Sequence, residues 1–456
     1  MKENTFGIRR WFSVVIAGLV GQFAWTIENM YLNRYVFYLT QSTDYIPVMV
    51  ALSAIVATVT TLFMGALSDR IGRRKLFVAI GYILWGISIV LFNVVKPENF
   101  TSATLANSLF LSGTMVIVLD CVMTFFGSTS NDAAFNAFVT DNTTNENRGK
   151  VESVISILPI VSMLVIFGGF NFLTTGKEPR WDIFFWIFGV LTFCCGIGMF
   201  FLLPKDICKP NKNEKYLISI FYGFRPSVVK KNVTLYLALV LFAVFNIAIQ
   251  VFFPYFMVYI ENNLKITGMT FTLCLGGIFL IAGIVTVIIG LFMDKIGKFV
   301  LLYPMLGVGI LGCMILFLAP NIYGLCIGGC LLIISYMVLT AVISAIIRDY
   351  TPKDEAGSFQ GVRMIFAVCI PMVTGPYIGE ACYAFTAETY VNEYMQEVKL
   401  PNEFIFLGAA IVLALAFIPA VILMIHHKKE VKKLKEAETC STLDKEWLCK
   451  KKIRFY

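Results

Sequence analysis

Long apolar segments recur along the whole chain, and they constrain its fold more than any other feature. Segments of about 20 residues with few charges are long enough to cross the hydrocarbon core of a bilayer as helices. The 456 residues are 58% hydrophobic and only 14% charged, which leaves too little charge to cover the surface of a water-soluble protein of this size. The sequence therefore predicts an all-α membrane protein with twelve transmembrane helices, at residues 11–39, 45–67, 76–95, 107–139, 151–173, 183–203, 233–260, 269–291, 300–319, 323–347, 361–383 and 403–425.

The positive charges of the loops predict how these helices are oriented. Twelve spans place both chain ends on the same side of the membrane. Of the 37 Lys and Arg residues, 30 fall in segments on that side and five in loops on the other. Because short loops rich in Lys and Arg stay in the cytoplasm, we expect both termini to be cytoplasmic, in a plasma or inner cell membrane.

The longest loop between predicted helices divides the chain into two sets of six. We expect an N-terminal six-helix half at 1–203, a cytoplasmic central loop at 204–232, a C-terminal half at 233–425 and a basic cytoplasmic tail at 426–456. The tail carries ten Lys and Arg residues. Either it binds the anionic inner leaflet, or it is a solvated tail without a function of its own.

Two short patterns occur once in each set of six helices, which indicates that the two halves are repeats. One pattern (Gly, three residues, Asp, base, one residue, Gly, base) recurs at an offset of 225 residues, and another (Asp, one residue, Thr, five residues, Gly) at an offset of 208. Parallel repeats of this kind place a solute path between the halves, near the middle of the bilayer. The first pattern comprises Gly65, Asp69, Arg70, Gly72 and Arg73, then Gly290, Asp294, Lys295, Gly297 and Lys298; the second begins at Asp141 and at Asp349.

The charged loop at residues 65–75 has residue types that suit a conformational switch. Gly65 lets a helix pack close to its neighbour, and Gly72 permits a tight turn. Asp69 is able to contact a helix N-terminus or a base in one conformation and to lose that contact in another. A simple positive anchor is the alternative, but an anchor does not need the Gly and Asp spacing that recurs in the second half.

This loop resembles the loop between helices 2 and 3 of the major facilitator superfamily, and the resemblance extends over the chain in helix count, halves and loop placement. It implies the major facilitator fold, with twelve helices in two six-helix pseudo-repeats. It also implies transport by alternating access, as the two halves rock against each other. The conformational-switch residues it implies are Gly65, Asp69, Arg70, Gly72 and Arg73, with Asp294 in the second half.

Two shorter stretches carry a narrower resemblance. Residues 21–25 resemble the start of sucrose–proton symporters, and residues 132–137 with 141–143 are similar to the end of helix 4 in glycoside–pentoside–hexuronide:cation symporters. Ala134 stands where that second group has a proline. The predicted helix 2 lacks the acids that sodium-coupled members carry, so the resemblance implies protons rather than sodium as the coupling ion.

Polar residues inside the predicted spans gather on helices 1, 4 and 7, which line the path in the superfamily. A charge at mid-bilayer costs about 2.5–3.5 kcal/mol on insertion scales, so it normally faces a cavity or a partner. Helix 4 carries a polar residue at every fourth position from Asp120 to Asn136. We expect Glu28 or Asp132 to carry the coupling proton, with Asp120 as a further candidate. The expected solute-binding residues are Trp25, Asn29, Asn136, Asn246 and Gln250.

Each of these residues has a structural alternative. Glu28 could pair with Arg34, and Asp120 with a hydroxyl of helix 2, without any part in transport. The amides of helix 7 could serve only to hold helices together. We expect Arg363 to pair with an acid, either Asp349 or Asp294. The twelve cysteines lie mostly in apolar segments and predict small buried thiols rather than a metal site.

The sequence favours a secondary transporter that imports a sugar, a glycoside or a similar small polar solute together with a proton. One alternative is a proton-coupled exporter of amphiphilic drugs, and another is a sensor that keeps the carrier fold without transport. Nothing in the sequence resembles a nucleotide-binding loop, a metal cluster or a nucleophile–base set, so we do not expect an enzyme or a cofactor. The expected partners are the solute and the lipid bilayer, without nucleic acid, and a single chain is expected to suffice.

Overall fold

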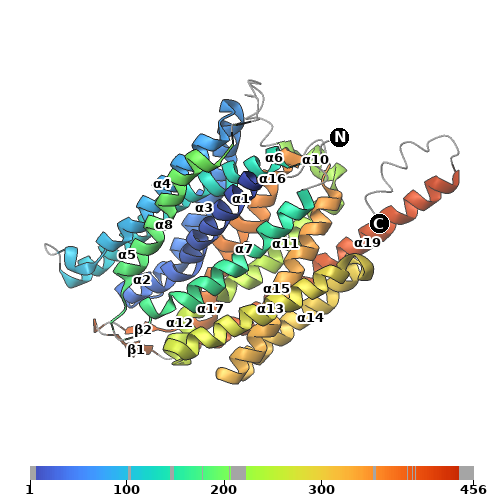
Figure 1. Cartoon of the computed structure of the whole chain (residues 1–456). Coiled ribbons are helices and arrows are strands. Elements are labelled where there is room, and N and C mark those ends of the chain that lie inside the picture. The colour runs from blue at the N-terminus through green and yellow to red at the C-terminus, as the bar shows by residue number, and fades with distance from the viewer. Residues whose placement is uncertain are drawn as a thin grey trace.

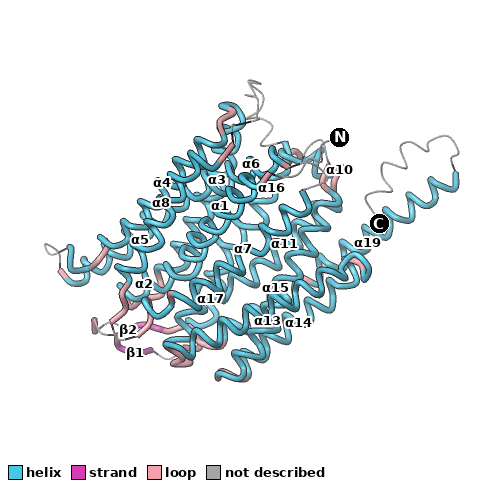
Figure 2. The backbone as a smooth tube through the Cα atoms, in the orientation of Figure 1, coloured by secondary structure: helices cyan, strands magenta, loops and turns pink. Residues whose placement is uncertain are grey.

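A computed structural model gives the conformation of residues 7–100, 104–143, 148–176, 178–204, 206, 222–352, 356–387, 389–392, 394–395 and 397–440. The described chain is almost entirely helical, with one short β-hairpin at one end of a helix bundle (Figure 2). Eleven helices of the described chain are long and apolar enough to cross a membrane, and a twelfth has a shorter apolar stretch at Val154–Gly169. The structure thus confirms the predicted twelve helices.

The first six of these helices include two that change their winding part-way. Helices 1 and 4 each contain a π-helical segment, in which one extra residue is accommodated per turn. Helix 1 is formed by α1 (Ile8–Thr26), η1 (Ile27–Tyr31) and α2 (Leu32–Thr40), helix 2 by α3 (Tyr45–Ile71), helix 3 by α4 (Arg74–Leu91), helix 4 by α5 (Leu105–Gly127), η4 (Ser128–Phe135) and α6 (Asn136–Asn142), helix 5 by α7 (Arg148–Gly169) and helix 6 by α8 (Trp181–Leu202).

The last six helices follow a short helix, α10 (Pro226–Lys231), and helices 7 and 11 among them each contain a π-helical segment. Helix 7 is formed by α11 (Val233–Phe252), η7 (Phe253–Tyr255), α12 (Phe256–Val258) and η8 (Tyr259–Asn263), helix 8 by α13 (Gly268–Ile296), helix 9 by α14 (Lys298–Leu318), helix 10 by α15 (Ile322–Tyr350), helix 11 by α16 (Ala356–Met364), η10 (Ile365–Cys369) and α17 (Ile370–Ala384), and helix 12 by α18 (Phe404–Leu415) and α19 (Phe417–Cys440).

The bundle has two distinct ends. The hairpin of β1 (Thr389–Val391) and β2 (Glu397–Lys399) marks one of them, which we call the hairpin end. The start of α1 lies at the opposite end together with α6, α10 and α16 (Figure 1), and we call this the terminal end. Helix 12 runs past the predicted end at residue 425, because α19 continues to Cys440 and extends away from the other helices (Figure 1). The start of the predicted tail is therefore helical, and residues 441–456 lie outside the described part of the chain.

Glycines allow some helices to pack in backbone contact. A Cβ atom added to Gly86 of helix 3 would lie 2.4 Å from the backbone nitrogen of Phe193 and 2.6 Å from the carbonyl oxygen of Gly189, both on helix 6. Helices 9 and 10 approach each other similarly, since a Cβ on Gly312 would lie 2.8 Å from the nitrogen of Leu332. Without a hydrophobic driving force inside a bilayer, such close packing is a main source of helix association.

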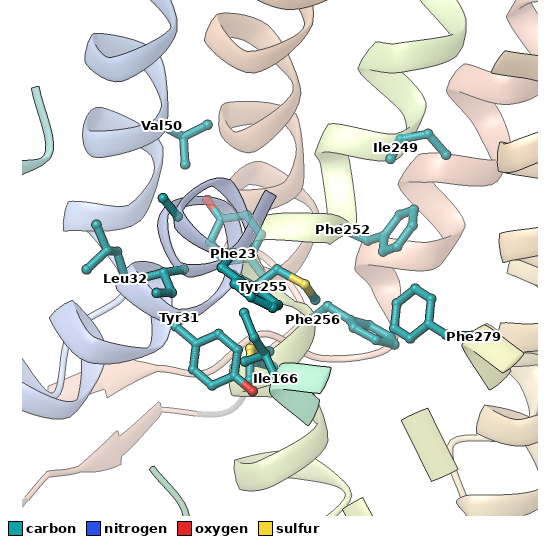
Figure 3. Close-up of a cluster of buried hydrophobic side chains, with 14 of the residues drawn as sticks. Phe23, Tyr31, Leu32, Val50, Ile166, Ile249, Phe252, Tyr255, Phe256 and Phe279 are labelled. Carbon is teal, nitrogen blue, oxygen red and sulfur yellow. The ribbon is translucent and has the colours of Figure 1, made fainter. Parts of the chain in front are cut away.

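Buried aromatic side chains from both sets of six helices meet in one cluster (Figure 3). Tyr31 of helix 1, Ile166 of helix 5, Phe256 of helix 7 and Phe279 of helix 8 lie together there. The ring of Phe167, next to Ile166 in the chain, stacks on that of Phe279 with 5.7 Å between centroids and 11° between planes. The two halves are therefore packed against each other at the level of these residues.

Candidate functional site

Two carboxyl groups from helices 1 and 4 are buried together in the first half. Glu28 lies in the π-helical segment η1, and Asp120 lies in α5; their residues are only 6% and 2% exposed. The Thr124 hydroxyl, one turn after Asp120, donates to Oε1 of Glu28 at 2.8 Å. The Ser53 hydroxyl of helix 2 lies near Asp120, and it donates to the backbone oxygen of Val50 at 3.2 Å. Asp120 thus has a hydroxyl of helix 2 nearby and a second buried acid beside it.

Asp132 lies further along helix 4, in the π-helical segment η4. The Ser128 hydroxyl donates to its Oδ2 at 3.1 Å. Asn136 is exposed, and its amide donates to the backbone oxygen of Asp132 at 3.1 Å. The predicted stripe of helix 4 is therefore linked by hydrogen bonds from Ser128 to Asp132, but the π-helical segment breaks its regular four-residue register. This break is a correction to the expectation of one uninterrupted α-helical face.

A chain of hydrogen bonds holds the polar residues of helix 1 against helices 3 and 4. The indole of Trp25 donates to Oδ1 of Asn131 at 3.3 Å, and the Asn131 amide donates to the Tyr82 hydroxyl at 2.7 Å. The Trp25 ring also lies 5.1 Å from that of Trp85. Asn29 donates to the backbone oxygen of Trp25 at 2.8 Å. Asn131 was not among the predicted residues, because it lies one position off the four-residue spacing that directed attention to its neighbour Asp132.

The two amides of helix 7 lie apart from this network. Asn246 and Gln250 are half-buried, and neither is among the hydrogen-bond partners of Glu28 or Asp132 given above. A Cβ added to Gly375 of helix 11 would lie 2.4 Å from Cβ of Gln250, so helices 7 and 11 are in close contact there. The stem of Gln250 therefore has a packing role, which was the structural alternative for this residue.

At the terminal end, an ionic cluster connects the loop between helices 2 and 3 with the end of helix 4. Arg74, the first residue of α4, pairs with Asp69 and also with Asp141, whose Oδ2 lies 3.2 Å from its Nε. It donates to the Ser68 hydroxyl as well. The sequence assigned Arg70 and Arg73 to the switch, but both are exposed, so Arg74 is the base that the fold brings to Asp69.

The glycines of this loop differ in their roles. Gly72 has φ 68°, in the left-handed region that favours glycine, so the predicted tight turn is present. A Cβ on Gly65 would meet only the Cβ of Ala133, at 3.9 Å, which is an ordinary contact. The expectation that Gly65 permits an unusually close helix approach is therefore wrong for this conformation.

The second half contains a matching ion pair. Nζ of Lys298 lies 2.6 Å from Oδ2 of Asp349, which is near the end of helix 10. Lys298 and Arg74 are each the first residue of the helix that follows the turn, although the sequence pattern aligned Lys298 with Arg73. Asp349 thus pairs with Lys298 rather than with Arg363 as we expected, and Arg363 donates to the Ser344 hydroxyl at 3.4 Å. The side chain of Asp294 lies outside the described part.

At the hairpin end, an ion pair joins the two halves. Nη2 of Arg34 in helix 1 lies 2.6 Å from Oε1 of Glu261 in helix 7, with both side chains largely buried. The same guanidinium donates to the Thr174 hydroxyl at 2.9 Å and lies 5.7 Å from the centroid of the Trp181 ring. Arg34 therefore pairs with the other half and not with Glu28. Glu261 was missed because it lies just past the predicted end of helix 7 at residue 260.

Two more polar contacts join the halves at this end. Asn171, after helix 5, donates to the Thr272 hydroxyl of helix 8 at 3.3 Å. The Tyr383 hydroxyl of helix 11 donates to that of Thr43, before helix 2, at 3.0 Å. Together with the ion pair and the aromatic cluster of Figure 3, these contacts close the hairpin end between the halves.

The model of the Major Facilitator Superfamily matches residues 11–376, which is well over half of the chain. The chain belongs to the Major Facilitator Superfamily. The superfamily's twelve helices in two six-helix pseudo-repeats are those described above, and the protein has a membrane transporter fold. Comparison with curated proteins gives no match.

Solved structures of superfamily transporters share the whole fold. The nucleoside transporter NupG superposes with a TM-score of 0.61 at 13% identity, over 91% of this chain and 98% of the other. A bacterial homologue of the human lysosomal transporter Spinster, in an inward-facing and occupied conformation, superposes with a TM-score of 0.65 at 12% identity, over 92% and 97% of the two chains. At this identity the likeness shows the fold of these transporters.

Proposed function

We propose that the protein is a secondary transporter that imports a sugar, a glycoside or a similar hydroxyl-rich solute with a proton. The observation that carries the proposal is a set of three acids inside a bundle of the transporter fold: Glu28 and Asp120, which are buried, and Asp132, which is partly exposed. Acids within a membrane bundle are costly, and they mark ion and proton pathways in transporters. Proton coupling suits a group that is able to bind and release a proton as its access to water changes.

The residues beside these acids suit a solute with many hydroxyl groups. The Trp25 indole is a flat apolar surface for a sugar ring, and Asn29 lies one turn away on the same helix. Asn136 on helix 4 and the half-buried Asn246 and Gln250 on helix 7 carry amides that donate and accept hydrogen bonds. Their placement on helices 1, 4 and 7 supports a path between the two halves.

The contacts at the two ends support alternating access. Closure at the hairpin end rests on the pair of Arg34 and Glu261, which belong to different halves and must separate for that end to open. The clusters at the terminal end lie within one half each, so they are able to stay intact while the halves rock. We further propose that the terminal end is cytoplasmic, that the membrane is a plasma or inner membrane, and that one chain suffices.

Solute-driven proton movement in proteoliposomes tests this function. We expect one solute among disaccharides, pentoses, glucuronides and nucleosides to make the external medium more alkaline. Nucleosides are included because they carry a ribose and the fold resembles that of a nucleoside transporter. Glu28→Gln and Asp132→Asn should each reduce this signal at least tenfold, whereas Glu98→Gln, at an exposed acid, should leave it unchanged. Uptake of labelled solute without proton movement, equal in all variants, would indicate a facilitator instead.

An exporter of amphiphilic compounds is the second candidate. A small apolar pocket in the second half is lined by Phe252, Phe256 and Phe279 together with aliphatic side chains, and Figure 3 shows these three rings close together. The lining is apolar, and at a cavity volume of about 10 Å³ the pocket has to widen before it holds an apolar group. Cells that overproduce the protein would then lose a fluorescent cationic dye faster than control cells, and Phe256→Ala would abolish the difference. A dye efflux rate equal to that of control cells rules this candidate out.

A further inference from the structure

The buried carboxyl groups of Glu28 and Asp120 each keep one oxygen without a hydrogen-bond partner. Oε2 of Glu28 and Oδ1 of Asp120 are shielded from solvent and accept no hydrogen bond from the residues that the structure describes. Their other interactions are with hydroxyls: that of Thr124 donates to Glu28, and that of Ser53 lies beside Asp120. Buried polar atoms in proteins nearly always have a partner, so two orphaned oxygens at one place indicate a missing donor or cation.

The carboxyl groups of Glu28 and Asp120 interact with each other electrostatically. Thr124, which contacts Glu28, lies one helical turn after Asp120, so both face the same part of helix 1. Asp120 is the charged group that acts most strongly on Glu28, followed among charged groups by Asp132. Both carboxyl groups of the pair also interact electrostatically with the thiol of Cys121, which follows Asp120 on helix 4. From helix 2, the Ser53 hydroxyl lies near Asp120.

No base of the described residues is among the groups that act on this pair. Arg34, the basic residue further along helix 1, forms an ion pair with Glu261 of the other half. Two adjacent carboxylates that are shielded from water and lack a counter-charge cannot both stay ionised. The Thr124 hydroxyl donates to Glu28 and stabilises its ionised form, so one group of the pair is able to stay ionised while the other holds a proton.

We propose that Glu28 and Asp120 form a single proton-binding unit, which holds one exchangeable proton between two carboxyl groups while Asp132 ionises separately. On binding, one carboxylate oxygen forms an O–H bond with a proton taken from water; on release, that bond breaks and the proton returns to water. Asp132 is a separate group because its carboxyl accepts from Ser128 of its own helix and its residue is partly exposed. This assignment refines the proton coupling of the proposed function and rests on it for its role in transport.

Infrared difference spectroscopy of the full-length protein, purified without any solute, tests the pair directly. Raising the pH should bleach a carboxylic C=O stretching band, which reports the bound proton. Glu28→Gln and Asp120→Asn each remove a like charge from the remaining acid, so each should lower the midpoint of the residual band by about one pH unit or more, a tenfold weaker proton affinity. Asp132→Asn removes a weaker like charge from Glu28, so it should lower the midpoint by less than either variant of the pair, and Glu98→Gln should leave the midpoint in place.

A variant that keeps both acids guards against misfolding as an explanation. Thr124→Val removes only the hydroxyl that donates to Glu28, so the ionised form loses a hydrogen bond and the midpoint should rise. Equal shifts in Asp120→Asn and Asp132→Asn would overturn the pairing of Glu28 with Asp120 alone. If sodium chloride bleached the band at constant pH and choline chloride did not, proton binding would be overturned as the role of this site. The site would then bind a metal cation. Because no solute is present, failure of sugar transport leaves this measurement unaffected.

Discussion

Arg74 joins three side chains at the terminal end, and its position at the start of α4 explains why. The first residue of a helix projects its side chain back over the preceding turn, where Asp69 and Ser68 lie. Its residue is largely buried, whereas the side chains of Asp69 and Asp141 are 24% and 28% exposed. Removing this one base would take two ion pairs away from two partly buried acids that lie beside each other.

We therefore expect Arg74→Gln to destabilise the protein by on the order of 2–3 kcal/mol, somewhat less than the full cost of breaking a wholly buried pair because both acids reach solvent. Arg73→Gln is the matched control, since the neighbouring base is exposed. Thermal unfolding of the purified protein in detergent should show a lower melting temperature for the first variant only. Equal melting temperatures for both variants would contradict the role of Arg74.

At the scale of elements, the π-helical segments decide which side chains reach the interior. Glu28 lies in η1 and Asp132 in η4, so two of the three acids on helices 1 and 4 are on turns that depart from α-helical winding. Such segments often occur at functional sites because the extra residue turns a side chain out of the regular register. Helix 11 has a π-helical segment too, at Ile365–Cys369, in the middle of the span.

The contact of helices 3 and 6 gives a prediction about packing. Gly86→Ala would bring a methyl group within 2.6 Å of the Gly189 carbonyl oxygen. The backbone of helix 6 cannot move aside as easily as a flexible side chain would. We expect a loss of about 1–3 kcal/mol, as for other overpacked interiors. Gly276→Ala in helix 8 is the control, because nothing lies within 4 Å of its added Cβ.

The measurement is unfolding in a detergent that separates helices, monitored by the loss of tryptophan fluorescence. Gly86→Ala should unfold at a lower detergent concentration than the unmodified protein, and Gly276→Ala should unfold at the same concentration. Unchanged resistance in Gly86→Ala would show that the two helices separate slightly at no cost.

At the scale of the whole molecule, the hairpin end is held closed by contacts between the halves. Asn171 and Thr272 belong to different halves, and their side chains are 3.3 Å apart. If transport requires this end to open, a covalent bond at this place should stop it.

We expect the pair Asn171→Cys and Thr272→Cys, in a protein whose native cysteines are replaced, to form a disulfide on oxidation. Oxidation should abolish solute transport in proteoliposomes, and a reductant should restore it. Each single variant, treated in the same way, should transport normally. Full transport by the cross-linked protein would contradict an alternating opening of the hairpin end.

The sequence by itself determined the membrane class, the twelve helices and the two repeats, because spans of apolar residues and repeated loop patterns are local properties of the chain. It also identified Glu28, Asp120 and Asp132, since an acid within an apolar span is conspicuous wherever its helix packs. The predictions from residue spacing assumed regular α-helices. They failed for the polar residues of helix 4, because the pattern of apolar residues does not reveal a π-helical segment.

Only the tertiary structure decided which residues meet. Arg34 pairs with Glu261 across the two halves, 227 positions apart in the chain, and no local spacing reveals such a contact. Arg74 rather than Arg73 reaches Asp69, because the turn at Gly72 places the start of α4 one residue later than the matching helix start at Lys298 after Gly297. The pairing of Glu28 with Asp120 likewise depends on how helix 1 packs against helix 4, and that packing sets which buried charges must be neutralised.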